Sequence, residues 1–486
     1  MRSRIASNLE WLFAQDETTS ALTPAKLLAS VAAKRAAPHE QIRLPSGFSG
    51  HDYAVYLLHI AAEIEHVLMV QYLYAAYSLG GPQVPESRHA EVQRWRDVIL
   101  DIAKEEMAHL ITVENLLRLL GAPLNLDRSD YPWDAPFFPF PFNLEPLSLS
   151  SLARYVVTES PQEWPADVSP DEQREIRYRA TDGHTEGVKR VGILYDLMIK
   201  VIGDRALVPD SLFQADTLPY QASWEEWGRG YRGGAKGTPD GNGKPPVLLI
   251  GAAYSRESAV QALQAVADQG EAPHVDPGAG ERSHFRRFLR LYREFPREDA
   301  GWSPVAPVPL NPRTMGGKLP IAGTTYIANA HSRHWADLFN LRYRMLLLYL
   351  SHAYRLSGKV DCHADSKARG LLVHRTFAEM YNLRALSQTL MHLPLNDPPD
   401  APRAGPPFEM PYSIALPAVE RDCWLLHVDL LEASAALIRT IEKGGSQREL
   451  DYLRSLAAID RESTAAIAAL MGIDAGVALR RAERAK

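Results

Sequence analysis

The chain has 486 residues, of which 46% are hydrophobic and 23% are charged. This is the composition of a globular protein, and it excludes a mainly disordered or fibrous chain. A net charge of −6 argues against nucleic acid or an anionic membrane as a partner.

The cysteines and the N-terminal sequence bear on the compartment. Cys362 and Cys423 are the only two cysteines; they cannot build a disulfide framework and suit a reducing environment. The N-terminus lacks the continuous apolar core and small-residue cleavage site of a signal peptide. The most apolar stretches, 67–79 and 344–350, are shorter than the roughly eighteen residues that a membrane helix needs. We therefore expect a cytoplasmic protein that does not enter a membrane.

Helical periodicity, with glycine and proline stops, divides the first half of the chain into predicted helices. Residues 1–50 form a lead-in with one short helix near 24–36. The helices that follow are predicted at 52–79, 88–120, 148–159, 170–203, 254–269 and 281–294. The segment 204–247 is predicted to be a loop. Its Gly228-x-Gly230-x-x-Gly233 string is not interpreted as a dinucleotide site, because no strand precedes it and no helix follows it.

The second half is also predicted to be helical. Residues 296–324 are rich in proline and are interpreted as a crossing between two domains. Beyond them, helices are predicted at 325–357, 366–393, 413–443 and 446–470. No convincing alternating strand pattern appears. The predicted fold class is all-α, with a first domain over 51–295 and a second helical domain over 325–486.

The first long helix carries a carboxylate within its apolar face. Glu65 lies in the middle of a stripe at helical spacing that comprises Leu58, Ala61, Ala62, Leu68, Met69 and Tyr72. An ionised carboxylate buried at such a place is costly unless it is paired or holds a cation. The second long helix repeats the anomaly. Glu106 and His109, spaced i and i+3 so that they project the same way, fall within an apolar stripe of Ile99, Ile102, Val113 and Leu117.

These three side chains indicate a metal site. A single Glu on one helix and Glu-x-x-His on the next make up half of a carboxylate-bridged di-metal site in a four-helix bundle. The plain alternatives are that Glu65 pairs with a buried arginine or reaches water, and that Glu106-x-x-His109 lies on a helix surface. Metal binding is favoured because two consecutive long helices both turn acids inward.

Two segments carry a resemblance to a known family. IEHVLMVQYLYAAYSL at 64–79 and AKEEMAHLITVENLLRLLGAP at 103–123 are similar to the ferritin-like domain of the iminophenyl-pyruvate dimer synthase family. Members of that family act in bisindole pigment biosynthesis. The segments Asp268-Gln-Gly-Glu271 and Ser283-His-Phe-Arg-Arg-Phe288, and AGPPFEMP at 404–411, also resemble it. The resemblance covers about 50–295.

The resemblance implies a ferritin-like four-helix bundle that holds one or two iron ions, with manganese as the alternative. By matching positions it assigns as metal ligands Glu65, Glu106, His109, Glu271 and His284. It also implies an acid on the third bundle helix, where this sequence has Ile193. Asp196, one turn further on, and Glu186, two turns back, are the candidates to replace it.

The function implied by the resemblance is a metal-dependent oxidoreductase of specialised metabolism. Its substrate would be an amino-acid-derived small molecule such as an imine, coupled oxidatively with O₂ or peroxide and supplied by a partner oxidase. Two alternatives stay open on the same scaffold. One is an iron-storing or metal-free structural protein, and the other is a metal-carboxylate halogenase or oxygenase.

Overall fold

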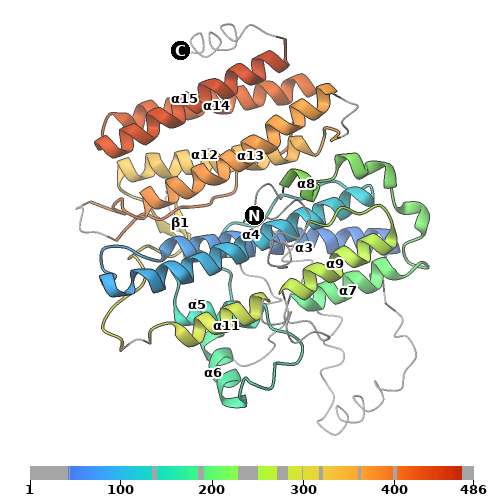
Figure 1. The fold of residues 1–486 in the computed structure, drawn as a ribbon, viewed down its shortest axis with the longest axis horizontal. Coiled ribbons are helices and arrows are strands. Elements are labelled where there is room, and N and C mark those ends of the chain that lie inside the picture. Colours follow the sequence, from blue (N-terminus) through green and yellow to red (C-terminus); the bar gives the residue numbers. More distant parts are fainter. Residues whose placement is uncertain are drawn as a thin grey trace.

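The computed structural model of the protein describes residues 42, 44–133, 140–183, 191–227, 250–270, 283–297, 299–316, 321–358, 363–397 and 402–472. Within these residues the fold is almost entirely helical (Figure 1). The expected all-α class is therefore confirmed. The helix expected near 24–36 and the glycine string at 228–233 lie outside the described residues.

Two long antiparallel helices form the centre of the molecule (Figure 1). α3 spans Gly50–Ser78 and α4 spans His89–Leu119, close to the expected bounds. α3 begins at a capping box, in which the Ser49 hydroxyl accepts a hydrogen bond from the Asp52 N–H and the Asp52 carboxylate accepts one from the Ser49 N–H. The chain leaves α3 at Gly80 with a φ of +101°, which glycine adopts without a steric penalty.

Two shorter helices fill each of the other two positions of the bundle. They are α5 (Leu149–Thr158), α7 (Gly192–Gly203), α9 (Arg256–Gly270) and α11 (His284–Glu294). α7 follows α5 directly in space, because the Val191 N–H donates a 3.4 Å hydrogen bond to the Thr158 carbonyl oxygen. α9 packs against α7 and α4, and α11 packs against α5 and α4. The result is a four-helix bundle whose third and fourth members are interrupted.

The prediction of a single helix over 170–203 is wrong. α6 ends early, at Pro170–Ala180, and α7 begins at Gly192; residues 184–190 lie outside the description. Asp182 and Gly183 follow α6 with positive φ angles of 50° and 92°. Such left-handed residues end α-helices, so the Asp-Gly pair was the signal for a stop.

The second half packs as a further group of helices against the α3–α4 pair (Figure 1). Its members are α12 (Ala330–Ala353), α13 (His363–Leu390), α14 (Glu420–Glu442) and α15 (Gln447–Leu470). The helix expected from 413 begins only at Glu420, after Pro417, because proline lacks an N–H and disfavours helical backbone before it. The shorter elements are η2 (Glu86–Arg88), η3 (Asp210–Leu212), η4 (Ala215–Tyr220), α8 (Trp224–Trp227) and the paired strands β1 (Pro312–Arg313) and β2 (Thr325–Tyr326).

α3 is a long, apolar and largely buried helix. By length and composition it could cross a membrane, with a mean hydropathy of 1.4 over its most apolar window. The expectation that every apolar stretch is too short to span a membrane is therefore wrong for α3. However, 78% of that window is buried inside the molecule, as is typical of a helix in a protein core. α3 packs against α4 and α7 in the bundle and faces α12 and α13 on another side, which accounts for its hydropathy.

Candidate metal centre

Three of the expected ligands meet in the centre of the bundle. Glu65 on α3 and Glu106 and His109 on α4 are each 2% exposed. The Nδ1 atom of His109 lies 3.0 Å from Glu106 Oε2 and 3.4 Å from Glu65 Oε2. The helical periodicity of α3 and α4 thus brings together the residues that the sequence pattern singled out.

The fourth expected residue, His284, reaches the same place from α11. It is the first residue of that helix, whose N-cap Ser283 accepts a hydrogen bond from the Arg286 N–H. His284 Nδ1 lies 2.8 Å from Glu106 Oε1, and the His284 and His109 rings stack with centroids 5.3 Å apart. The remaining candidates Glu271 and Glu186 lie outside the described residues.

Glu159 is a member of the cluster that the sequence pattern did not reveal. It follows the last residue of α5 and is buried. Its Oε2 lies 3.6 Å from His284 Nδ1, and its Oε1 accepts a 2.5 Å hydrogen bond from the Tyr72 hydroxyl. The signal for it was the helix stop at Ser160-Pro161, which places an acid at a break in the third bundle helix.

Asp196 does not replace the missing acid of the third helix. Asp196 and Ile193 are both on the exposed side of α7. The α7 residue that faces the cluster is Tyr195, whose hydroxyl donates a hydrogen bond to Glu65 Oε1. The acid was sought on α7, whereas Glu159 provides it one segment earlier.

Both imidazole rings are held from outside the cluster. His284 Nε2 hydrogen-bonds Glu105 Oε2 at 2.9 Å, and His109 Nε2 hydrogen-bonds Gln269 Oε1 at 2.9 Å. Since a carboxylate or amide oxygen only accepts, both Nε2 atoms carry a proton. Both Nδ1 atoms therefore face the acids, and one nitrogen of each ring is available to a metal. Metal-binding histidines are commonly oriented in this way.

The acids and imidazoles strongly perturb one another. Burial, reinforced by the charge of Glu106, raises the pKa of Glu65 to about 8. Burial also opposes the charged form of His109, but hydrogen bonds to Glu106 and Glu65 outweigh it and raise the His109 pKa to about 10. Without a metal, protons on the cluster supply the positive charge that these buried carboxylates require.

The donor atoms present fit a metal ion. Glu65 Oε2, Glu106 Oε1 and His284 Nδ1 are buried and make no hydrogen bond of normal geometry to a described residue. Side-chain atoms of Glu106, His109 and His284 all lie within 4.8 Å of one another. A cavity of about 20 Å³, lined in part by Glu65, Glu106, His109 and Glu159, holds about one water-sized sphere. Carboxylate oxygens and imidazole nitrogens suit iron or manganese.

The sequence just before His284 contains a familiar ligand spacing. Glu281-Arg-Ser-His284 repeats the Glu106-x-x-His109 spacing. Di-metal four-helix bundles take one Glu from each of two helices and Glu-x-x-His from each of the other two. Glu65 and Glu159 are the candidates for the single acids. Glu281, which was not among the expected ligands either, lies outside the described residues.

Comparison with known proteins places this bundle in a class. Residues 58–293 match the family model described as Ferritin-like. The match agrees with the ferritin-like four-helix bundle that the resemblance implied. A solved ferritin-like protein from Caulobacter vibrioides aligns over 74% of this chain and 97% of its own, at 16% identity. Its TM-score of 0.38 is too low to support a comparison of details.

Two relatives of this chain have names that state a reaction. The chain is 27% identical over 399 residues to dichlorochromopyrrolate synthase from Lentzea aerocolonigenes, covering 71% of this chain and 35% of that protein. It is 27% identical over 383 residues to 2-imino-3-(indol-3-yl)propanoate dimerase from Chromobacterium violaceum, covering 72% and 33%. The family expected from the sequence is thus confirmed as a resemblance. The chain spans about a third of the length of these relatives.

Proposed function

We propose that the protein is a ferritin-like enzyme whose buried centre binds one or two iron ions, with manganese as the alternative, and oxidises an amino-acid-derived small molecule. One observation carries the proposal. Five buried side chains with metal-binding atoms converge in one cluster, and they are Glu65, Glu106, His109, Glu159 and His284. All of them except His284 line one small cavity. This arrangement is difficult to explain as structure alone, because several buried carboxylates destabilise a fold unless a cation neutralises them.

The residues of the chain have distinct parts in this proposal. A bound iron would supply redox chemistry and an open position for O₂ or peroxide. Glu65, Glu106 and Glu159 would neutralise its charge. Tyr195 fixes the Glu65 carboxylate through a hydrogen bond, and Glu105 fixes the His284 ring. The burial of all these groups keeps bulk water from the centre.

The substrate class rests on the two named relatives. One is named a dimerase of an indolyl imino acid and the other a synthase of a dichlorinated pyrrole acid. We extend this to an amino-acid-derived imine, supplied by a partner oxidase and coupled oxidatively. Because the chain spans about a third of either relative, the proposal covers a class of substrate and not a particular product.

Metal content is the first test. Glu106→Ala and His109→Ala are each expected to lose most of the bound iron without unfolding, because both residues face the cavity. Glu114→Gln is the matched control: Glu114 is buried on the same helix, where it accepts hydrogen bonds from the Asn125 N–H. Inductively coupled plasma mass spectrometry of the purified proteins gives the answer. Equal iron in parent and variants contradicts the assignment.

Turnover is the second test. The imine is generated from L-tryptophan by an added amino-acid oxidase, and O₂ uptake and coupled products are followed by electrode and mass spectrometry. We expect coupled product that depends on the iron-loaded parent and is absent with Glu106→Ala. Iron that binds without any turnover favours storage, and a halogenated or hydroxylated product favours the halogenase or oxygenase.

A further inference from the structure

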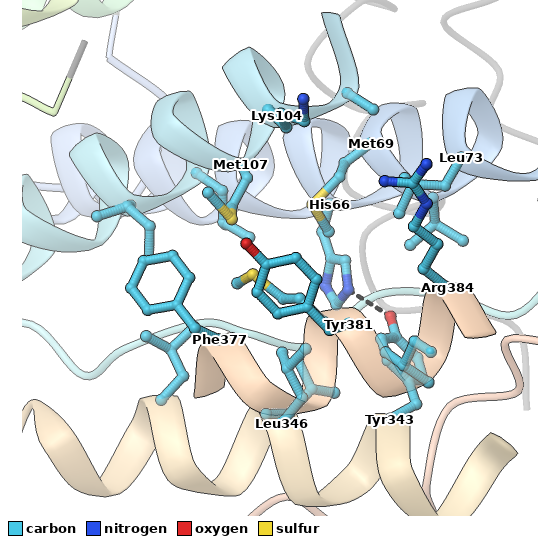
Figure 2. A pocket seen from close by; sticks show the side chains of 18 of the residues that line it. His66, Met69, Leu73, Lys104, Met107, Tyr343, Leu346, Phe377, Tyr381 and Arg384 are labelled. Carbon is cyan, nitrogen blue, oxygen red and sulfur yellow. Dashed lines mark hydrogen bonds between the residues drawn. The ribbon is translucent and has the colours of Figure 1, made fainter. Parts of the chain in front are cut away.

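A second cavity lies on a different face of the α3–α4 pair. It has a volume of about 370 Å³ and lies between these helices and α12 and α13 (Figure 2). His66 and Met107 line it, whereas their neighbours Glu65 and Glu106 face the metal centre. Consecutive residues of an α-helix point about 100° apart. The backbones of α3 and α4 therefore separate this cavity from the metal centre.

The walls of the cavity suit a flat apolar body. Methionines come from both sides, Met69 and Met107 from the bundle and Met380 from α13. Aromatic rings of Phe377 and Tyr381 lie across it in Figure 2. Thioethers adapt to a bound shape and pack well on aromatic edges. The volume is in the range of about 300–1,000 Å³ that is typical of small-molecule sites.

Two polar side chains in the wall are hydrogen-bonded to each other. His66 Nε2 hydrogen-bonds the Tyr343 hydroxyl (Figure 2). Tyr343 also accepts a hydrogen bond from Arg128 Nε at 3.2 Å. This wall therefore presents no charged group that lacks a partner, and an apolar ring system can pack against it.

Two cationic side chains line the cavity. Lys104 and Arg384 both line it (Figure 2). Lys104 is paired with Asp101 at 2.9 Å, whereas Arg384 makes no ion pair or hydrogen bond to any residue that the structure describes. Burial and the nearby Arg384 charge both lower the pKa of Arg96. Within the described part of the chain, the positive charge of Arg384 is therefore not neutralised.

At Arg384 the cavity adjoins a second hollow. This hollow, of about 900 Å³, shares Tyr77, Leu100 and Arg384 with the cavity, and its other cationic side chains are Arg96, Arg403 and Arg448. Its acid, Glu449, is engaged by the Ser446 N–H and by His331. A molecule in the apolar cavity would thus have its anionic end drawn toward Arg384.

We propose that the cavity between α3–α4 and α12–α13 binds an aromatic carboxylic acid, with its rings among the methionines and its carboxylate at Arg384. The methionine and aromatic walls favour rings over an extended alkyl chain. The site is independent of the metal centre, and the proposal holds whether or not that centre binds iron.

Isothermal titration of the full chain with 2-naphthoic acid tests the proposal. Its neutral analogue 2-naphthamide and dodecanoic acid are the comparison ligands. We expect naphthoic acid to bind more tightly than either. Arg384→Gln should weaken naphthoic acid roughly tenfold, since a charge-assisted contact is lost, and should change naphthamide little. Arg384 is on the exposed side of α13, so the variant should fold, which a thermal melt checks.

Further variants distinguish binding in this cavity from binding at the metal centre or on the protein surface. Leu73→Trp, at the cavity wall, should block both naphthyl ligands, whereas Arg454→Gln on the surface of α15 should affect neither. His284→Ala should leave naphthoic acid affinity unchanged, and a loss there would assign binding to the metal centre instead. Equal affinity for acid and amide, no effect of Arg384→Gln, or tighter binding of dodecanoic acid would overturn the proposal.

Discussion

The acids at the candidate metal centre differ in how the chain holds them. Glu65 and Glu106 lie in the middle of long helices, where hydrogen-bonded turns on both sides fix their direction. Glu159 lies just beyond the end of α5, and its carboxylate is fixed by the hydroxyl of Tyr72. A sequence pattern can therefore predict the direction of an acid within a helix, but not that of an acid beyond a helix end.

Replacing the newly found acid tests whether it belongs to the centre. Glu159→Gln keeps the shape and the Tyr72 contact but removes a negative charge, so bound iron should fall by at least half if the carboxylate is a ligand. Asp196→Asn, on the exposed side of α7, should retain the parent's iron. Iron analysis of both variants decides whether Glu159 or Asp196 is the acid of the third helix. The reverse result would restore Asp196 as the acid of the third helix.

Residue spacing predicted Glu65, Glu106 and His109 because the helical period fixes the faces of α3 and α4. It could not predict Glu159, since at a helix end the period stops and the direction of a side chain depends on the break. His284 was expected from resemblance alone. The repeat Glu281-x-x-His284 would have supported it from the residues themselves.

Glu114, away from the candidate metal centre, makes the stability of the protein depend on pH. Burial raises its pKa from 4.5 to about 8, although hydrogen bonds from the Asn125 N–H partly offset this. The folded protein therefore keeps Glu114 protonated, while the unfolded chain ionises it above pH 4.5. Its stabilising contribution is complete below pH 4.5 and is lost as the pH rises toward 8, by about 1.4 kcal/mol per pH unit.

Glu114→Gln should remove this dependence. Urea unfolding at pH 5, 6.5 and 8 should show the variant gaining stability relative to the parent as the pH rises. Glu420→Gln, at a half-exposed carboxylate on α14, serves as a comparison away from this site. A constant difference between Glu114→Gln and the parent across these pH values would show that Glu114 ionises normally.

At the scale of elements, the interruptions of the third and fourth helices position the site. Glu159 follows the end of α5 and His284 begins α11, so two of the five converging side chains come from helix ends. Helix-length patterns predicted the bounds of α3, α4 and α5 closely. They failed over 170–203, where the Asp-Gly stop outweighed an apolar continuation.

The helices of the second half are joined by one buried arginine. Arg342 on α12 bonds Glu379 on α13 at 3.1 Å, Asp460 on α15 at 2.9 Å and Ser434 on α14 at 2.6 Å. All four side chains are buried. Removing one partner of such a cluster leaves buried charges without compensation. This destabilises a fold more than replacing the whole cluster with apolar residues does.

Arg342→Met should therefore destabilise the protein by roughly 3–5 kcal/mol, measured by urea unfolding. Arg454→Gln, an exposed pair partner of Asp451, should change stability by less than about 1 kcal/mol. Adding Glu379→Gln and Asp460→Asn to Arg342→Met should restore part of the loss. If the triple variant is as unstable as the single one, packing and not charge explains the effect.

At the scale of the whole molecule, one continuous buried core joins the two predicted domains, 51–295 and 325–486. Tyr343 on α12 contacts both His66 and Arg128. Arg128 also donates to the Phe408 carbonyl oxygen, and Arg118 donates a 2.5 Å hydrogen bond to the Tyr354 carbonyl oxygen. The apolar cluster likewise runs from α3 and α4 into α12 and α13. Composition marked the proline-rich crossing, but it could not show how the flanking parts pack.

This packing predicts how the protein unfolds. Separating the two parts would expose the apolar face of α3 and α4 that α12 and α13 cover, and would leave Arg128 and Tyr343 without their partners. Since burial of apolar surface is the main driving force of folding, neither part should remain folded once the other unfolds.

Differential scanning calorimetry should show one transition with equal calorimetric and van't Hoff enthalpies. Leu346→Ala, in the cavity wall on α12, should lower that single midpoint without splitting it. Two resolved transitions, with only the later one shifted by iron, would instead establish 51–295 and 325–486 as independent domains.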